Sequence, residues 1–139
     1  MGAWGWGSFE NDEALDWVIE LEQSEDLSVI TRTLEAILDS DDDYLDATDC
    51  SMALAAAETV AALAGRPEPS LPEEVARWVT DRQREPPQEH PLVDGSIRAK
   101  ARRAIEAILS DSELKELWEE TDELEQWKAT VTDLLVRLA

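Results

Sequence analysis

Hydrophobic residues recur at helical spacing along most of the chain, and no stretch alternates apolar and polar residues as a half-buried strand does. The apolar stripes run through residues 14–21, 27–38, 47–64, 75–79, 97–108, 114–118 and 127–138. This pattern predicts an all-α fold, in which about six to seven helices form one irregular or orthogonal bundle over residues 1–139.

Residues that cap helix N-termini precede most of these stripes. The predicted caps are Asn11, Ser24, Asp94 and Ser112, with capping boxes at 70–73 and 122–125. Phe9 stands where an apolar side chain would make the entry contact of the first helix. The caps divide the chain into short helices joined by short loops.

The third segment, residues 47–64, is rich in alanine on several faces. Small side chains let neighbouring helices approach closely, so we expect this helix to lie at the centre of the bundle. Gly65 and Pro67 follow it in the order that is usual at a helix C-terminus. Residues 85–94 contain three prolines and are expected to form a linker.

The formal net charge of −21 is unevenly distributed along the chain. Residues 1–50 carry 15 acidic side chains and one basic side chain, whereas residues 51–110 are nearly neutral. A field of this sign repels nucleic acids and anionic membranes, and it favours cationic protein partners or simply solubility. One cysteine, no apolar leader and no run of 18 apolar residues predict a soluble cytoplasmic protein.

Nucleophilic catalysis has little support in the sequence. The one histidine, His90, lies in the proline-rich linker, and a catalytic histidine needs a rigid neighbour that orients it. Cys50 has no basic residue near it in sequence and is expected to be a small buried side chain. We therefore expect no enzyme activity and no cofactor.

The acidic run from residue 39 to 49 offers weak metal ligands. Asp39, Asp41 and Asp43 match the first three ligand positions of an EF-hand loop. Tyr44 replaces the required glycine and Cys50 replaces the bidentate glutamate, which excludes an EF-hand. Weak binding of a divalent cation stays open beside the simpler interpretation, a solvated loop.

Glu58 is the acidic residue with the most unusual surroundings, because alanines surround it in the central helix. A buried carboxylate must be paired or must shift its pKa. We expect a salt bridge, or hydrogen bonds from backbone amides of the N-terminal segment, with a functional role as the alternative. Asp12 and Asp16 are further candidates for a carboxylate site.

Basic and aromatic residues have mostly structural interpretations. Four cations, Arg98, Lys100, Arg102 and Arg103, lie together, and in so acidic a chain we expect intramolecular ion pairs rather than a nucleic-acid site. Four tryptophans, Trp17, Trp78, Trp118 and Trp127, fall on apolar stripes and are expected in the core. Trp4 and Trp6 precede any helix, so they either plug the bundle or anchor a partner.

The N-terminal motif Met1-Gly-Ala-Trp-Gly-x-Gly7, followed by Phe9, Asn11-Asp12 and Asp16-Trp17, resembles the DUF4259 family of bacterial proteins of unknown function. Further matching motifs are Tyr44-Leu45-x-Ala47, Ala53-Leu-Ala-Ala-Ala-Glu58, Leu71-Pro-Glu-Glu-Val75 and Ser112-Glu-Leu-x-Glu-Leu-Trp-Glu-Glu120, followed by Trp127. The resemblance implies a small bacterial protein and supplies no activity, cofactor or catalytic residue. Its glycines and tryptophans predict an N-terminal strap, in which Gly5 and Gly7 let the backbone approach the helices.

Three functions remain open at this stage. The first is an acidic protein that binds a cationic partner, such as an immunity-type or antitoxin-like inhibitor, for which Trp4, Trp6, Phe9, Asp12, Asp16 and Glu58 are the binding candidates. The second is a structural or scaffold domain, which could form a homodimer. The third, least favoured, is a carboxylate-based metal enzyme.

Overall fold

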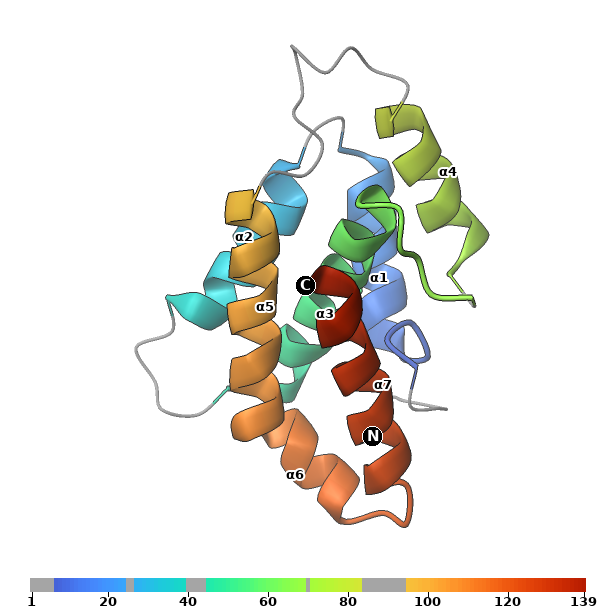
Figure 1. Ribbon diagram of the computed structural model, residues 1–139. Helices are drawn as coiled ribbons and strands as arrows, with labels where there is room; N and C mark the ends of the chain where they lie inside the picture. Colours follow the sequence, from blue (N-terminus) through green and yellow to red (C-terminus); the bar gives the residue numbers. More distant parts are fainter. Residues whose placement is uncertain (1–6, 25–26, 40–44, 70, 84–94) are drawn as a thin grey trace.

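The computed structural model describes residues 7–24, 27–39, 45–69, 71–83 and 95–139 (Figure 1). Its helices are α1 (Asp12–Glu22), α2 (Ser28–Leu38), α3 (Ala47–Leu63), α4 (Glu73–Gln83), α5 (Gly95–Ser110), α6 (Glu113–Glu119) and α7 (Leu124–Leu138). Within these ranges there are seven helices and no strand, which confirms the all-α prediction. None of these helices is both long and apolar enough to cross a membrane.

Helix α3 lies at the centre of the bundle, as its alanines predict. It contacts every other helix in the described ranges, with α2 and α5 on one side, α1 and α4 on the other, and α7 across its front in the view of Figure 1. Ala53, Ala55, Ala56, Ala57 and Ala61 have no exposed surface. Since these side chains end at Cβ, the neighbouring helices can pack close to the α3 backbone from all sides.

The aromatic core forms as predicted around this central helix. Trp17, Trp78, Trp118 and Trp127 are at most 6% exposed. Two of their indole N–H groups also donate hydrogen bonds to other segments of the chain, because a buried N–H needs an acceptor. Trp17 Nε1 donates to Thr33 Oγ1 at 2.9 Å, and Trp78 Nε1 donates to the Ser24 carbonyl at 2.9 Å.

Several helix ends confirm the predicted caps. The Asn11 side chain accepts a hydrogen bond from the Ala14 amide at 2.8 Å, and the Ser112 side chain accepts one from the Lys115 amide at 3.1 Å. Gly65 follows α3 with φ +88°, a left-handed conformation that favours glycine at this position.

Two predicted caps are wrong. Helix α2 starts at Ser28 rather than after Ser24, and Leu27, at the N-cap position before it, makes no capping hydrogen bond from its side chain. Helix α7 starts after Glu123, because Thr121 Oγ1 accepts from the Glu123 amide and holds residues 121–123 in a turn. Residue 70 and residue 94, which carry the predicted caps of α4 and α5, lie outside the described residues.

The sequence places Leu15 on the buried stripe of the first helix, and this is also wrong. Leu15 is 39% exposed, whereas Ala14, Trp17, Val18 and Leu21 are buried. These four residues define a narrow face turned toward the core, and Leu15 lies beyond its edge. Leu15 and Ile19, which is 56% exposed, therefore lie on the outer surface of α1.

Substitution of Ala56 by leucine tests the close packing of α3. Ala56 has no exposed surface, so the added atoms must displace neighbouring helices, at a cost of about 1–3 kcal/mol in the free energy of unfolding. Ala36→Leu, at an exposed position of α2, is the matched control and should cost less than about 0.5 kcal/mol. Urea titration measures the free energy of unfolding of both variants. Equal decreases in the two variants would contradict the central packing of α3.

Candidate functional site

A buried ion pair joins the middle of α3 to the last turn of α7. Glu58 has no exposed surface, and the Arg137 side chain is 14% exposed. Arg137 Nη1 donates to Glu58 Oε1 at 2.6 Å and Nη2 donates to Oε2 at 3.1 Å. This two-pronged geometry is the strongest form of a carboxylate–guanidinium pair. It confirms the salt bridge that the burial of Glu58 predicts.

The N-terminal turn adds a third hydrogen bond to this carboxylate. Ser8 Oγ donates to Glu58 Oε2 at 3.0 Å, and Ser8 itself is buried. The sequence correctly indicates that the N-terminal segment reaches Glu58. The donor, however, is a side-chain hydroxyl rather than a backbone amide.

Arg137 makes two further interactions through its guanidinium group. Nε donates to Asp133 Oδ2 at 2.8 Å, and Nη1 also donates to the Arg66 carbonyl at 3.3 Å. Burial alone would lower the pKa of Arg137, but the bonds to Glu58 and Asp133 outweigh it and raise the pKa above its ordinary value. The guanidinium therefore stays charged and ties α7 to both α3 and the loop after it.

Glu68, in the loop between α3 and α4, is the second carboxyl group at this place. It lies close to Glu58, and two neighbouring carboxyl groups repel each other when both are charged. Burial and the adjacent Glu58 carboxylate are the main causes that raise the pKa of Glu68 to about 8. Arg137 opposes this rise, and Glu10 makes a smaller contribution to it. At neutral pH Glu68 is mostly protonated.

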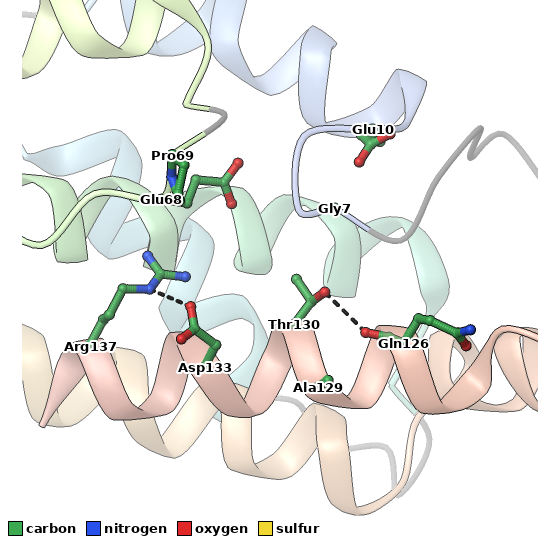
Figure 2. Close-up of a pocket in the computed structure, with 9 residues that line it drawn as sticks. All are labelled: Gly7, Glu10, Glu68, Pro69, Gln126, Ala129, Thr130, Asp133 and Arg137. Atoms are coloured by element: carbon green, nitrogen blue, oxygen red, sulfur yellow. Dashed lines mark hydrogen bonds and ion pairs between the residues drawn. The ribbon is translucent and has the colours of Figure 1, made fainter.

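Glu68, Asp133 and Arg137 line an open pocket of about 440 Å³ (Figure 2). Gly7 and Glu10 from the N-terminal turn and Glu68 and Pro69 from the α3–α4 loop form one wall, and α7 forms the other. The residues from α7 are Gln126, Ala129, Thr130, Asp133 and Arg137. Figure 2 shows the Glu10 and Glu68 carboxyl groups and the Arg137 and Asp133 side chains around one space.

Gly7 shapes the rim of this pocket. The Gly7 carbonyl accepts a hydrogen bond from the Glu10 amide at 3.1 Å, which closes a tight turn. A Cβ atom at residue 7 would collide with the Glu10 carboxylate. The glycine thus leaves room for a carboxylate that folds back toward the pocket.

The family model for DUF4259, a domain of unknown function, matches residues 2–130. The chain belongs to the DUF4259 family. A search of curated proteins and a search of solved structures each gave no match. Within this DUF4259 chain, Ser8, Glu58 and Glu68 lie inside the matched residues, and Asp133 and Arg137 lie beyond them.

The structure separates the predicted binding residues of this DUF4259 protein into different places. Phe9 is 5% exposed and packs in the core, so it is not available to a partner. Asp12 and Asp16 lie exposed on α1 and do not line the pocket around Glu58. Trp4, Trp6 and Gly5 lie outside the described residues, and so does the strap they were expected to form.

The acidic loop is described only at its two ends. Asp39 is exposed at the C-terminus of α2, whereas Asp41 and Asp43 lie outside the described residues. Asp46 caps α3 through a 3.0 Å hydrogen bond from the Asp49 amide. Burial, together with the Asp46 charge, raises the pKa of Asp49. No group of three potential metal ligands occurs in the part of the chain that the structure describes.

Other predicted residues have structural roles. Cys50 is fully buried, and burial raises the pKa of its thiol to about 12, so the thiol is unreactive at neutral pH. In the basic cluster, Lys100 pairs with Glu35 at 2.7 Å, as expected. Arg102 and Arg103 are exposed. His90 lies outside the described residues.

Sequence reasoning missed Ser8, Glu68 and Arg137. Glu68 stands between two prolines in a loop, where an acidic residue is ordinarily solvated. Arg137 falls in the last turn of the seventh helix, where a cation is expected simply to complement the helix dipole. The one available signal was the buried Glu58, which requires a cation from elsewhere in the chain.

Replacement of Arg137 by methionine should be strongly destabilising. The variant leaves the Glu58 carboxylate buried without its cation, and loss of one member of such a pair costs about 3–5 kcal/mol. Addition of Glu58→Gln to this variant removes the unpaired charge and should restore part of that loss. The comparison variant is Arg32→Met, which breaks an exposed pair with Glu20 and should cost at most about 1 kcal/mol. Unfolding with guanidinium chloride measures the free energy of unfolding of each variant. If Arg137→Met and Arg32→Met lost equal amounts of it, a stabilising role for the buried pair would be contradicted.

The free energy of unfolding should depend on the protonation of Glu68. The folded protein holds this proton more tightly than the unfolded chain, whose carboxyl has the ordinary pKa of 4.5. Its contribution to stability is complete below pH 4.5 and is lost as the pH rises to about 8. Glu68→Gln, which keeps a neutral hydrogen-bond donor, should lose this part of the pH dependence. Parallel stability curves for the two proteins would contradict the raised pKa.

Proposed function

We propose that this protein is a small acidic binding protein that docks a cationic surface of a protein partner. The observation that carries the proposal is the outer face of α1, where apolar and acidic side chains lie together in the open. Leu15 and Ile19 are one helical turn apart, and so are Asp12 and Asp16. All four point away from the buried face of α1.

The charges on this face favour a cationic partner. Asp12 and Asp16 form no ion pair with any described residue, whereas Glu20, the next acidic residue along α1, is paired with Arg32. Two exposed carboxylates beside two exposed apolar side chains complement a surface with basic residues around an apolar centre. Two copies of such a face would repel each other, which argues against a homodimer formed through α1.

The inhibitor form of this hypothesis is an immunity-type or antitoxin-like protein that covers a basic surface in the cytoplasm. The charge of residues 1–50 supports this form, since a strong field of one sign accelerates association with a partner of opposite sign. The proposal assigns no catalytic activity and no cofactor to the chain. The alternative is a scaffold domain whose acidity serves only solubility.

A matched pair of charge reversals tests the proposal. The protein, tagged at its C-terminus, is used to capture partners from its native cytosol, and a captured protein is then purified and its association rate measured. Asp16→Lys on the outer face of α1 should slow association by about tenfold at low salt, because it opposes the steering field. Glu106→Lys on α5 changes the net charge equally and should have a much smaller effect.

Ile19→Ala provides a second, uncharged measurement. Loss of an apolar anchor should mainly speed dissociation rather than slow association. The proposal is overturned if Asp16→Lys and Glu106→Lys behave alike with the same partner, or if no partner is captured at low salt. In the second case the scaffold alternative becomes the better account.

A further inference from the structure

The pocket beside Glu58 holds more acidic groups than its one cation can neutralise. Glu10 and Glu68 lie in one wall, Asp133 lies in the other, and Glu58 lies behind Glu68. Among the described residues of the lining, Arg137 is the one with a basic side chain, and its guanidinium already binds Glu58 and Asp133. Arg66 contributes a carbonyl oxygen to this guanidinium.

The closeness of Glu58 and Glu68 indicates that a bound cation would be stabilised most next to Glu68. Burial and the nearby Glu58 charge raise the pKa of Glu68 to about 8, because two negative charges close together repel each other, so Glu68 holds a proton at neutral pH. That proton is the counter-charge of the site when the pocket is empty. A cation placed against Glu68 would serve the same purpose and release the proton.

We propose that this pocket binds the ammonium or guanidinium group of an organic cation between the Glu10 and Glu68 carboxyl groups on one side and Asp133 on the other. The volume of about 440 Å³ lies within the range of small-molecule sites and suits a cation the size of an arginine side chain. Glu68 and Glu10 supply the carboxylates that face the cation, and Gly7 gives the Glu10 carboxylate its place at the rim.

An organic cation fits this pocket better than a divalent metal ion does. Calcium takes six to eight oxygen ligands at short range, and magnesium requires nearly octahedral geometry. Here both Glu58 oxygens and one Asp133 oxygen already accept hydrogen bonds from Arg137. The remaining carboxyl groups come from two separate segments, which suits the multiple, spread-out N–H donors of a guanidinium.

Binding is coupled to proton release in a defined ratio. One cation enters, Glu68 ionises, and its proton passes to the buffer, so that the net charge of the site is unchanged. At a pH below the pKa of Glu68 in the empty site, about 8, and above its lowered pKa in the cation-bound site, this release should approach one proton for each cation bound. The charges that face Glu68 during this exchange are Glu58 from α3, Arg137 and Asp133 from α7, and Glu10 from the N-terminal turn.

Calorimetric titration with two isosteric probes tests the proposal. Nα-acetyl-arginine amide carries the guanidinium, and Nα-acetyl-citrulline amide has nearly the same shape without the charge. At neutral pH the first should bind saturably and release close to one proton, as measured in two buffers of different ionisation enthalpy. The second should bind at least about tenfold more weakly, because it lacks the charged contact with the carboxylates.

Three variants localise the effect. Glu68→Gln should abolish proton release and weaken binding of the arginine probe by about tenfold or more. Gly7→Ala should weaken it less, because it only displaces the Glu10 carboxylate. Glu106→Gln on α5 should leave binding unchanged. Circular dichroism melting of each variant separates loss of the site from loss of the fold.

Agmatine, a small free amine with a guanidinium group, distinguishes a free organic cation from an arginine side chain of a protein as the natural occupant of the pocket. Tighter binding of agmatine than of the arginine probe indicates a free amine, whereas equal or weaker binding indicates the side chain of a protein. The proposal is overturned if amide signals of Gly7 and Thr130 show no saturable shift with either cation, if the citrulline probe binds equally well, or if Glu68→Gln keeps proton release. Because Asp16→Lys leaves the pocket intact, failure at this site and failure of the α1 interface are distinguishable.

Discussion

The burial of one carboxylate organises the parts of this structure that lie far apart in sequence. Glu58 sits in the middle of the central helix with no exposed surface, so its charge must be satisfied from within the protein. Ser8 and Arg137 supply the hydrogen bonds, and Arg137 also holds the Arg66 carbonyl. One buried charge thus joins the N-terminal turn, α3, the loop after it and the end of α7. Apolar packing alone would not specify this arrangement, because it has no preferred partner.

The alanines of α3 make this arrangement sterically possible. Because alanines lie on several faces of α3, α7 can approach closely enough for Arg137 to reach Glu58. Larger residues would push α7 outward and leave the carboxylate without its cation.

Local sequence signals predicted the helices well, because periodicity and caps are properties of neighbouring residues. Asn11, Ser112 and Gly65 have the roles that their residue types indicate. Ser24 and the 122–125 box failed, since other residues nearby could also begin a helix and tertiary packing decided between them. Glu58 was recognisable from its alanine surroundings. Its partner was not, because Arg137 is 79 residues away and nothing in its own neighbourhood marks it.

The acidic side chains of the protein act differently on the surface of α1 and in the pocket between α7 and the α3–α4 loop. On α1, Asp12 and Asp16 are exposed, and their charges act mainly at long range and weaken with salt. In the pocket, Glu68 is partly buried, so a cation that reaches it gains a short-range interaction that salt screens far less. Net charge alone cannot separate these cases, but the salt dependence of binding can. A partner that used both places would associate at a rate set by α1 and dissociate at a rate set by the pocket.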